Sequence, residues 1–311
     1  MRWLRRQLPV VVPALVLAAA FLLRVFNPGG IISDQQRTVF DYYQRFAPRV
    51  YEDAPVKIVD IDDESLAKLG QWPWPRTLLA QLVANLANAG AAVIAFDAVF
   101  AEPDRTSPAN VLPIWSATAD IDEKLKQELA ALPDNDKIFA RVIKQAGNVV
   151  TGFALIPENN GRVPLQRGNF AFGGDDPRQF LVAHGGAVTN LPEIEQAAAG
   201  NGAFSFEPDT DFVIRRVPLV QRLNDKLYPL LALEALRVAL GAKTMVIKSS
   251  GANQQTAYGE HSGINNVKLG PNWIIPTDRR GQLLMHFTNE VPKRTVAAWK
   301  VMAPNFDPAE V

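Results

Sequence analysis

Residues 55–96 read PVKIVDIDDESLAKLGQWPWPRTLLAQLVANLANAGAAVIAF, and this stretch decides the fold class. Pro55–Ile61 has the composition of a strand, and Ala91–Phe96 is a short apolar run typical of a strand buried on both faces. Between them, Arg76–Ala89 places its apolar residues at helical spacing, and Gly90 suits the end of that helix. A strand, a helix and a second strand in this order predict a parallel βαβ unit with a right-handed crossover, and hence an α/β fold.

After this unit the chain continues to alternate predicted helices and strands. Helical spacing of apolar residues predicts helices at Ile121–Leu132, Asp136–Ala146 (capped by Asp134 or Asn135), Leu191–Ala199 and Pro229–Leu240. Strand-like runs predict a strand at Val149–Leu155, a hairpin of Gly202–Phe206 with Val213–Leu223, and a meander of Val267–Leu269, Trp273–Pro276 and Gln282–Phe287. Residues 157–186 are rich in turn formers and predict a long excursion. We expect one three-layer α/β domain over residues 55–311, with a mainly parallel central sheet and a β-meander towards the C-terminus.

The composition limits the classes of function that are open to the chain. With 311 residues, 48% of them apolar and 21% charged, it can bury a sizeable core. Its 32 basic and 32 acidic residues cancel, which argues against a nucleic-acid binder. The absence of cysteine excludes a disulfide scaffold, thiolate metal sites and a cysteine nucleophile. The sequence contains no dinucleotide-binding glycine motif, phosphate-binding loop or His-Glu-x-x-His motif, so it carries no mark of a common enzyme class.

The N-terminus has the pattern of a membrane anchor. Leu8–Leu23, LPVVVPALVLAAAFLL, carries no charge, and with the stem of Arg24 the apolar span reaches roughly 18 residues, near the lower limit for crossing a bilayer. Arg2, Arg5 and Arg6 precede it, so the positive-inside rule predicts a cytoplasmic N-terminus with the rest of the chain outside. We expect a basic cytoplasmic N-terminus at 1–7, a transmembrane anchor at 8–26, and a juxtamembrane helix and connector at 27–54.

Two other interpretations of the N-terminal segment remain open. A cleavable signal peptide has the same profile of charge and hydropathy, although the apolar run ends at Arg24-Val25-Phe26 without a small-x-small cleavage site. A buried core helix is the second alternative, although uniform apolarity leaves it without an amphipathic face.

A helix is predicted to lead from the membrane into the domain. Asn27-Pro28-Gly29-Gly30 is a cluster of helix breakers, after which Ser33–Arg45, SDQQRTVFDYYQR, predicts a helix with Ser33 as its N-cap. Apolar side chains lie at helical spacing on one side of this helix: Val39, Phe40, Tyr43 and Phe46.

Three blocks of sequence carry a specific resemblance. Val56–Arg76 ends in Trp-Pro-Trp-Pro-Arg, and Ala89–Pro108, AGAAVIAFDAVFAEPDRTSP, runs from a buried strand into Phe-Asp and then Glu-Pro-Asp. Gly200–Val220 reads GNGAFSFEPDTDFVIRRVPLV and precedes a helix that begins near Tyr228. These blocks, in this order, resemble the CHASE domain of the second type, the cyclase/histidine-kinase-associated sensory extracellular domain. The resemblance covers residues 40–287.

The resemblance implies sensing, with no catalysis in this segment. Such domains lie outside the cytoplasm in bacterial adenylate or guanylate cyclases, histidine kinases and serine/threonine kinases. We therefore expect the input region of a class III adenylate or guanylate cyclase in the bacterial inner membrane, with its domain in the periplasm or extracellular space; a histidine or serine/threonine kinase is the alternative. A homodimer is expected because the usual output domains act as dimers. The ligand would be an unidentified small molecule or a periplasmic partner.

The family pattern extends past the last residues of this chain. The domain normally ends with a Gly-Lys-Ile-Val-Leu-Val-Gly strand, followed by transmembrane helices and a cytoplasmic output domain, whereas this sequence ends at Ala309-Glu310-Val311. The resemblance therefore implies that the last strand of the sheet is missing, which would leave an edge that another chain could fill.

Acidic residues gather where two of the predicted strands end. Asp60 and Asp62 lie on one face because strand side chains repeat every two residues, and Asp97 closes the second strand. The carboxyl ends of parallel strands line the ligand crevice of an open α/β sheet, so Glu102 and Asp104 on the next loop lie just beyond. Clustered carboxylates repel one another unless a cation, a proton or an arginine such as Arg76 or Arg105 compensates them. Mg²⁺ or Ca²⁺, which prefer oxygen ligands, would do so with Asp60, Asp62 and Asp97 as the metal ligands.

The same residues have structural interpretations, which the sequence leaves open. Asp62 or Asp63 would cap the helix that follows, and Asp97 would satisfy loop amides with Arg76 as its buried partner. A metal-dependent hydrolase built on Asp60, Asp62 and Asp97 is the alternative function, although no nucleophile, base or phosphate-binding group accompanies them.

Aromatic and basic residues complete the candidate ligand site. Trp72 and Trp74 alternate with prolines, and their rings either cover the edge of the crevice as core or form a stacking surface for a ligand. Glu102-Pro103-Asp104 recurs as Glu207-Pro208-Asp209, and each copy follows a phenylalanine at the end of a predicted strand. Arg215 follows the second copy and either pairs with these acids or binds an anionic ligand.

Overall fold

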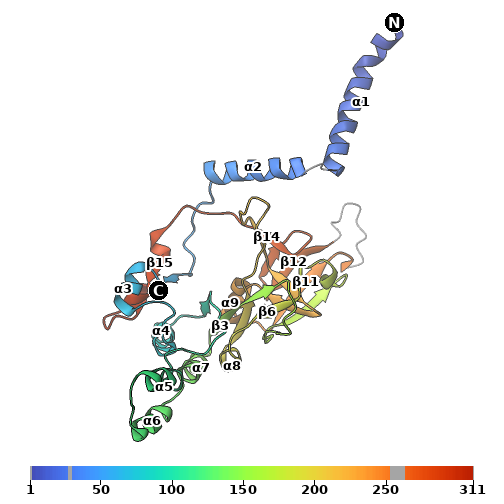
Figure 1. The fold of residues 1–311 in the computed structure, drawn as a ribbon. Coiled ribbons are helices and arrows are strands. Elements are labelled where there is room, and N and C mark those ends of the chain that lie inside the picture. The colour runs from blue at the N-terminus through green and yellow to red at the C-terminus, as the bar shows by residue number, and fades with distance from the viewer. Residues whose placement is uncertain (1, 27–29, 253–262, 311) are drawn as a thin grey trace. The chain divides into compact units, whose positions relative to one another are not determined.

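The computed structural model describes residues 2–26, 30–252 and 263–310. It divides into two compact units, Met1–Ala54 with His286–Pro292, and Pro55–Met285 with Lys293–Val311. The second unit is a mixed α/β fold of helices and several small sheets (Figure 1). This confirms the predicted α/β class, but several sheets replace the single central sheet that we expected.

The first unit contains α1 (Arg2–Phe26), which includes the predicted anchor. The side chains of α1 are described at 10–22 and at 26, and all of them are exposed. Across the described residues, no helix combines the length and the apolar character needed to cross a membrane. The predicted anchor is therefore not confirmed.

The second helix of this unit, α2 (Ile31–Phe46), begins after Gly30. Gly30 has a φ of 76°, a left-handed conformation that glycine adopts without strain. Ser33, the predicted N-cap, therefore lies inside the helix, and residues 27–29 of the predicted break lie outside the described part of the chain. Near its end, the Oε1 of Gln44 accepts a hydrogen bond from the amide of Phe287 at 2.9 Å.

The central sheet of the second unit is built around β3 (Val149–Ile156), which is buried along most of its length. β3 pairs in parallel with β2 (Ile94–Phe96) and with β7 (Gly200–Ala203), and β6 (Gly186–Val188) adds an antiparallel partner. α7 (Asn135–Ala146) immediately precedes β3, so the chain crosses from β2 to a parallel neighbour through a helix. The parallel crossover unit exists, but it joins β2 to β3.

The strand at the start of the domain does not join this sheet. β1 (Ile58–Asp60) pairs in parallel with β15 (Thr295–Ala297), and the two form a sheet of their own. The predicted βαβ unit of β1 and β2 is therefore wrong. Consecutive strands do not always pair, and here α3 (Asp63–Leu69) and the Trp-Pro-Trp-Pro segment intervene. β2 is also not buried on both faces, because Ala95 is exposed.

A second four-stranded sheet has the order β13-β12-β11-β4. Its strands in chain order are β4 (Asn169–Gly173), β11 (Thr244–Ser249), β12 (Ile264–Leu269) and β13 (Trp273–Pro276). β4 lies parallel to β11, so the segment that we predicted as an excursion supplies a strand. β12 and β13 pair antiparallel, as the predicted meander requires. The third meander strand, β14 (Gln282–Leu284), instead pairs with β8 (Arg216–Pro218).

The predicted hairpin of residues 202–206 and 213–223 does not form. Its first half belongs to β7, while β9 (Val220–Leu223) pairs with β10 (Lys226–Pro229) and β5 (Ala183–His184). A Cβ on Gly202 would lie 2.5 Å from the Cα of Leu231, the first residue of α9, so β7 is built to accept a helix at close range.

Helices cover the central sheet, and α4 packs along α7 (Figure 1). The remaining helices are α4 (Arg76–Asn88), α5 (Pro108–Thr118), α6 (Glu123–Ala130), α8 (Pro192–Ala197), α9 (Leu231–Ala239) and α10 (Ala298–Val301), with 3-10 turns at Pro177–Gln179, Pro292–Arg294 and Pro308–Glu310. α5 was not predicted, because Pro108 and Pro113 made its segment look like a loop; it buries no residue.

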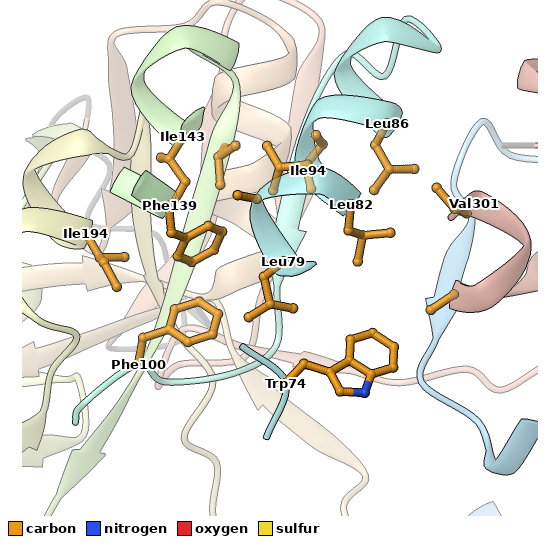
Figure 2. Close-up of a cluster of buried hydrophobic side chains, with 14 of the residues drawn as sticks. Trp74, Leu79, Leu82, Leu86, Ile94, Phe100, Phe139, Ile143, Ile194 and Val301 are labelled. Atoms are coloured by element: carbon orange, nitrogen blue, oxygen red, sulfur yellow. The ribbon is translucent and has the colours of Figure 1, made fainter. Parts of the chain in front are cut away.

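The largest core cluster lies among α4, α7, α8 and α10 and against the central sheet (Figure 2). Its rings pack edge to face, with the centroids of Phe100 and Phe139 5.2 Å apart. The labelled members are Trp74, Leu79, Leu82, Leu86, Ile94, Phe100, Phe139, Ile143, Ile194 and Val301. This cluster fixes α4 and α7 over β2, close to Arg76 and Phe100.

Candidate functional site

The three aspartates that we predicted as a metal site follow different elements. Asp60 ends β1 and is exposed, and Asp97 follows β2 and is also exposed. Their predicted meeting depended on β1 lying beside β2, and β1 pairs with β15 instead. Within the described ranges, no group of three or more histidine, aspartate or glutamate side chains is placed to hold a metal ion. Binding of Mg²⁺ or Ca²⁺ by Asp60, Asp62 and Asp97 therefore has no geometric support.

Asp62 caps α3, one of the structural interpretations that the sequence left open. Its Oδ1 accepts a hydrogen bond from the amide of Ser65 at 2.8 Å. The side chain and then the amide of Ser65 lower the pKa of Asp62 below its ordinary value. The Oγ of Ser65 also accepts a hydrogen bond from the amide of Trp299 at 3.1 Å, which ties α3 to α10.

Arg76, the first residue of α4, lies at the centre of a buried polar network. Its Nε donates to Oδ1 of Asp136 at 3.1 Å, and its Nη2 donates to the carbonyl oxygen of Glu102 at 3.1 Å. The guanidinium carbon lies 4.6 Å from the ring centroid of Phe100, within cation–π range. Asp97, which we considered as the partner of Arg76, is thus replaced by Asp136, which comes from α7.

Asp104 accepts most of the remaining hydrogen bonds of this network. The amide of Arg76 donates to its Oδ2 at 2.7 Å, and Nδ2 of Asn135 donates to the same atom at 3.0 Å. The amide and the hydroxyl of Thr106 both donate to its Oδ1. The amide of Asp104 in turn donates to Oδ2 of Asp136 at 2.8 Å. The Glu-Pro-Asp turn therefore joins the N-termini of α4 and α7, where a negative charge is favourable.

The two buried aspartates of the network have opposite pKa shifts. Burial alone would raise the pKa of Asp104, but the hydrogen bonds from Arg76, Thr106 and Asn135 outweigh it, so the pKa is lowered. Burial is the largest influence on Asp136 and raises its pKa, despite the Asp104 amide and the charge of Arg76. We missed Asp136 in the sequence because an acid in the first turn of a helix is usually solvated.

The two tryptophans differ in environment. Trp74 is almost fully buried in the main core, and its Nε1 donates to the carbonyl oxygen of Gly70 at 2.7 Å. Trp72 is exposed and packs its ring edge on Trp74 at a centroid distance of 6.1 Å. The structural interpretation holds for Trp74, and Figure 2 shows its ring beside Leu79. Of these two tryptophans, only Trp72 presents its ring to solvent.

Arg215 binds an acid of the second Glu-Pro-Asp turn, Glu207-Pro208-Asp209. The side chain of Arg215 is buried; its Nη1 lies 2.9 Å from Oδ2 of Asp209, and its Nη2 lies 2.7 Å from Oδ2 of Asp211. Arg215 holds the pKa of Asp211 far below its ordinary value. Of the two roles that we considered for Arg215, pairing with these acids is the one that the geometry favours.

A second buried polar group lies beside β3 and was not predicted. Glu234 and Arg237 form an ion pair on α9, with Oε1 and Nη2 2.7 Å apart. Asn201 on β7 donates its amide to Glu234 and its Nδ2 to Oε1 of Glu195. Burial raises the pKa of Glu195, and the hydrogen bond from Asn201 offsets only part of this. One feature of the sequence could have indicated this group: Glu234 and Arg237 lie three residues apart in a helix that is otherwise apolar.

A cavity of about 380 Å³ lies beside the C-terminal half of α4. One wall carries the amide side chains of Gln81, Asn85 and Asn88, and the other carries residues of the C-terminal segment such as Met302 and Phe306. Asn85 joins the two walls, because its Nδ2 donates to the carbonyl oxygen of Val301 at 2.8 Å. The size is within the range of small-ligand sites, and no charged side chain lines it.

Comparison with known families assigns the chain to a class of domain. Residues 14–311 match the family described as the CHASE2 domain, so the chain belongs to the CHASE2 family, as the three sequence blocks predicted. CHASE2 is a sensory domain of signalling proteins such as cyclases and kinases, and it lies on the extracellular side of membrane proteins. No curated protein and no solved structure matches the chain.

Proposed function

We propose that this chain is the extracytoplasmic signal-input region of a membrane-bound signal-transduction protein with a class III adenylate or guanylate cyclase as its output. The observation that carries the proposal is the CHASE2 match over residues 14–311. A histidine or serine/threonine kinase output is the alternative. In this proposal the segment senses, and the chemistry takes place in the output domain.

The proposal includes α1 as an uncleaved anchor in the bacterial inner membrane. Its support is the uncharged run Leu8–Leu23 after three arginines, together with a family whose domains lie outside the cytoplasm. The domain then lies in the periplasm or the extracellular space, where it meets a small ligand or a partner protein.

The hydrogen-bonded framework supports a sensing role. Arg76, Asp104 and Asp136 lock α4 to α7, while β1 and β15 join the segment that first enters the second unit to the segment that re-enters it at Lys293. The cavity beside α4 is bounded by the residues that follow β15 in that second segment. A ligand there would contact both the core and the C-terminal segment, so its binding would favour one arrangement of the two.

Single cysteines test the proposed placement, since the chain has none of its own. Asn272→Cys puts a thiol on an exposed turn of the domain, and Gln7→Cys puts one before the uncharged run. A membrane-impermeant maleimide should label the first variant in intact cells and the second only after lysis. Labelling of the second alone in intact cells would reverse the proposed orientation. Sequencing the gene beyond codon 311 tests the output, because a cyclase domain supports the proposal and a kinase domain supports its alternative.

A further inference from the structure

An apolar stripe runs along α2 and is open to solvent. Val39, Tyr42, Tyr43 and Phe46 follow the i, i+3, i+4, i+7 spacing of one helix face, and Val50, beyond the helix, is also exposed. Their exposed fractions are 50%, 56%, 68%, 83% and 82% in that order. The rings of Tyr42 and Phe46 stack on each other at 6.2 Å. Large apolar side chains gathered in this way on one helix face mark an interaction surface.

The other side of α2 is occupied within its own unit. The ring of Phe40 meets His286 edge to face at 5.9 Å, and Gln44 binds the amide of Phe287. The charged residues of the helix all lie off the stripe: Asp34, Arg37, Asp41 and Arg45. The stripe is therefore free of charge, and a copy of itself can face it without electrostatic repulsion.

The charges also argue against a lipid surface as the occupant of the stripe. Helices that lie in a membrane interface carry a polar face rich in lysine and arginine. The polar face of α2 has two acidic and two basic residues, which gives it no attraction for anionic lipid. Pairing with a second copy of the chain does not require a polar face rich in lysine and arginine.

The exposed area is sufficient for a weak to moderate dimer. With about 150–250 Å² for a fully exposed aromatic side chain, the stripe offers roughly 600 Å² per copy. Two copies would bury roughly 1,200 Å², the lower limit of specific interfaces. Val39 and Phe46 are seven residues apart and Tyr42 lies between them, which is the spacing of a two-helix coiled-coil seam.

We propose that α2 pairs in parallel with α2 of a second copy of this chain along the stripe of Val39, Tyr42, Tyr43 and Phe46. The pairing places each of Val39 and Phe46 against its own counterpart across a two-fold axis. The parallel direction rests on the proposed membrane anchor, since two anchored chains enter α2 from the same side; the pairing itself does not rest on it.

Disulfide cross-linking of the full 311-residue chain tests the pairing, because no native cysteine competes. Val39→Cys and Phe46→Cys should each give a covalent dimer on mild oxidation, in whichever of the membrane and soluble fractions holds the protein. Asp41→Cys, on the opposite side of α2, should not, and labelling with a small maleimide checks that its thiol is accessible. Similar cross-linking of all three variants, or of none, would overturn the proposal. Cross-linking only in a mixture of the Val39→Cys and Phe46→Cys chains would overturn the parallel arrangement.

A charge placed on the stripe gives an independent measurement. Val39→Asp puts two carboxylates opposite each other and should weaken dimerisation by roughly 100-fold in sedimentation equilibrium. Asp41→Asn should leave the dimer affinity unchanged. A wild-type chain that is monomeric at tens of micromolar would overturn the proposal.

Discussion

Asp104 is the residue on which the hydrogen bonds at the start of α4 converge. Asp104→Ala would leave the amide of Arg76, the amide of Thr106 and the side chain of Asn135 without their acceptor. We expect the free energy of unfolding to fall by about 2–4 kcal/mol, because buried donors would lose charge-assisted partners. Urea unfolding followed by tryptophan fluorescence measures it.

Glu102 in the same turn is the matched control for Asp104. Its side chain is exposed, and its carbonyl oxygen is the atom that binds Arg76, so Glu102→Ala should change the stability by less than about 0.5 kcal/mol. If both variants lose the same stability, the backbone of the turn holds α4 to α7, and the carboxylate of Asp104 does not.

His184 gives the domain a pH-dependent stability. Burial of its ring lowers the pKa of His184 from 6.5, Gln221 and Glu207 offset only part of this, and its Nε2 has no hydrogen-bond partner among the described residues. Since the unfolded chain takes up this proton at a higher pH than the folded chain, stability is full above 6.5 and falls as the pH drops through the folded pKa. The urea concentration at the midpoint of unfolding should therefore be lower at about pH 5.5 than at about pH 7.5.

Replacement of the histidine separates this contribution from others. In His184→Gln the fall in the unfolding midpoint should be smaller than in wild type, whereas His286→Gln, which changes an exposed ring, should keep the wild-type fall. An unchanged pH dependence in His184→Gln would assign the effect to other groups.

At the scale of single residues, the sequence could predict local interactions and not distant ones. The cap by Asp62 involves Ser65, three residues away, and was among the alternatives. The pairing of Arg76 with Asp136 spans 60 residues, and no local rule selects Asp136 over Asp97. The same limit applied to Asn201, whose role depends on Glu195 and Glu234 in two different helices.

At the scale of elements, β7 shows how backbone space determines packing. A Cβ on Gly202 would lie 2.5 Å from the Cα and 2.9 Å from the nitrogen of Leu231, atoms that cannot move independently of α9. Gly202→Ala should therefore lower the free energy of unfolding by roughly 1–3 kcal/mol, the usual cost of overpacking. Thermal unfolding by circular dichroism measures the loss.

A glycine of another strand serves as the control for this prediction. A Cβ on Gly173 in β4 meets nothing within 4 Å, so Gly173→Ala should be neutral or slightly stabilising. Equal destabilisation of the two variants would mean that backbone flexibility, and not contact with α9, determines the effect.

The elements that were predicted correctly are those with a clear internal period. α7 and β3 begin within one residue of the predicted positions, because their apolar patterns are strong and Asp134 caps the helix. Strand pairing was predicted poorly, because β1, β4 and β14 each pair with a strand far away in the sequence. Short strands carry too few side chains to specify a partner locally.

At the scale of the whole molecule, β1 and β15 bring together two parts of the chain that are 237 residues apart in the sequence. Ile58 lies opposite Thr295 in a parallel register, and both side chains are exposed. Both strands belong to the second unit, and each lies shortly after a point at which the chain enters that unit, at Pro55 and at Lys293.

A disulfide between β1 and β15 tests whether the two strands pair as described and how much their connection stabilises the domain. Cα atoms opposite each other in paired strands are close enough for a disulfide, so Ile58→Cys with Thr295→Cys should oxidise readily in a chain without other cysteines. Closing so long a loop should raise the free energy of unfolding by up to about 5 kcal/mol, because it restricts the unfolded chain. Non-reducing peptide mapping and thermal unfolding, with and without reductant, measure the bond and its effect. The offset pair Ile58→Cys with Ala297→Cys should oxidise more slowly, since it lies two residues out of register. Faster oxidation of the offset pair would mean that the two strands pair in another register.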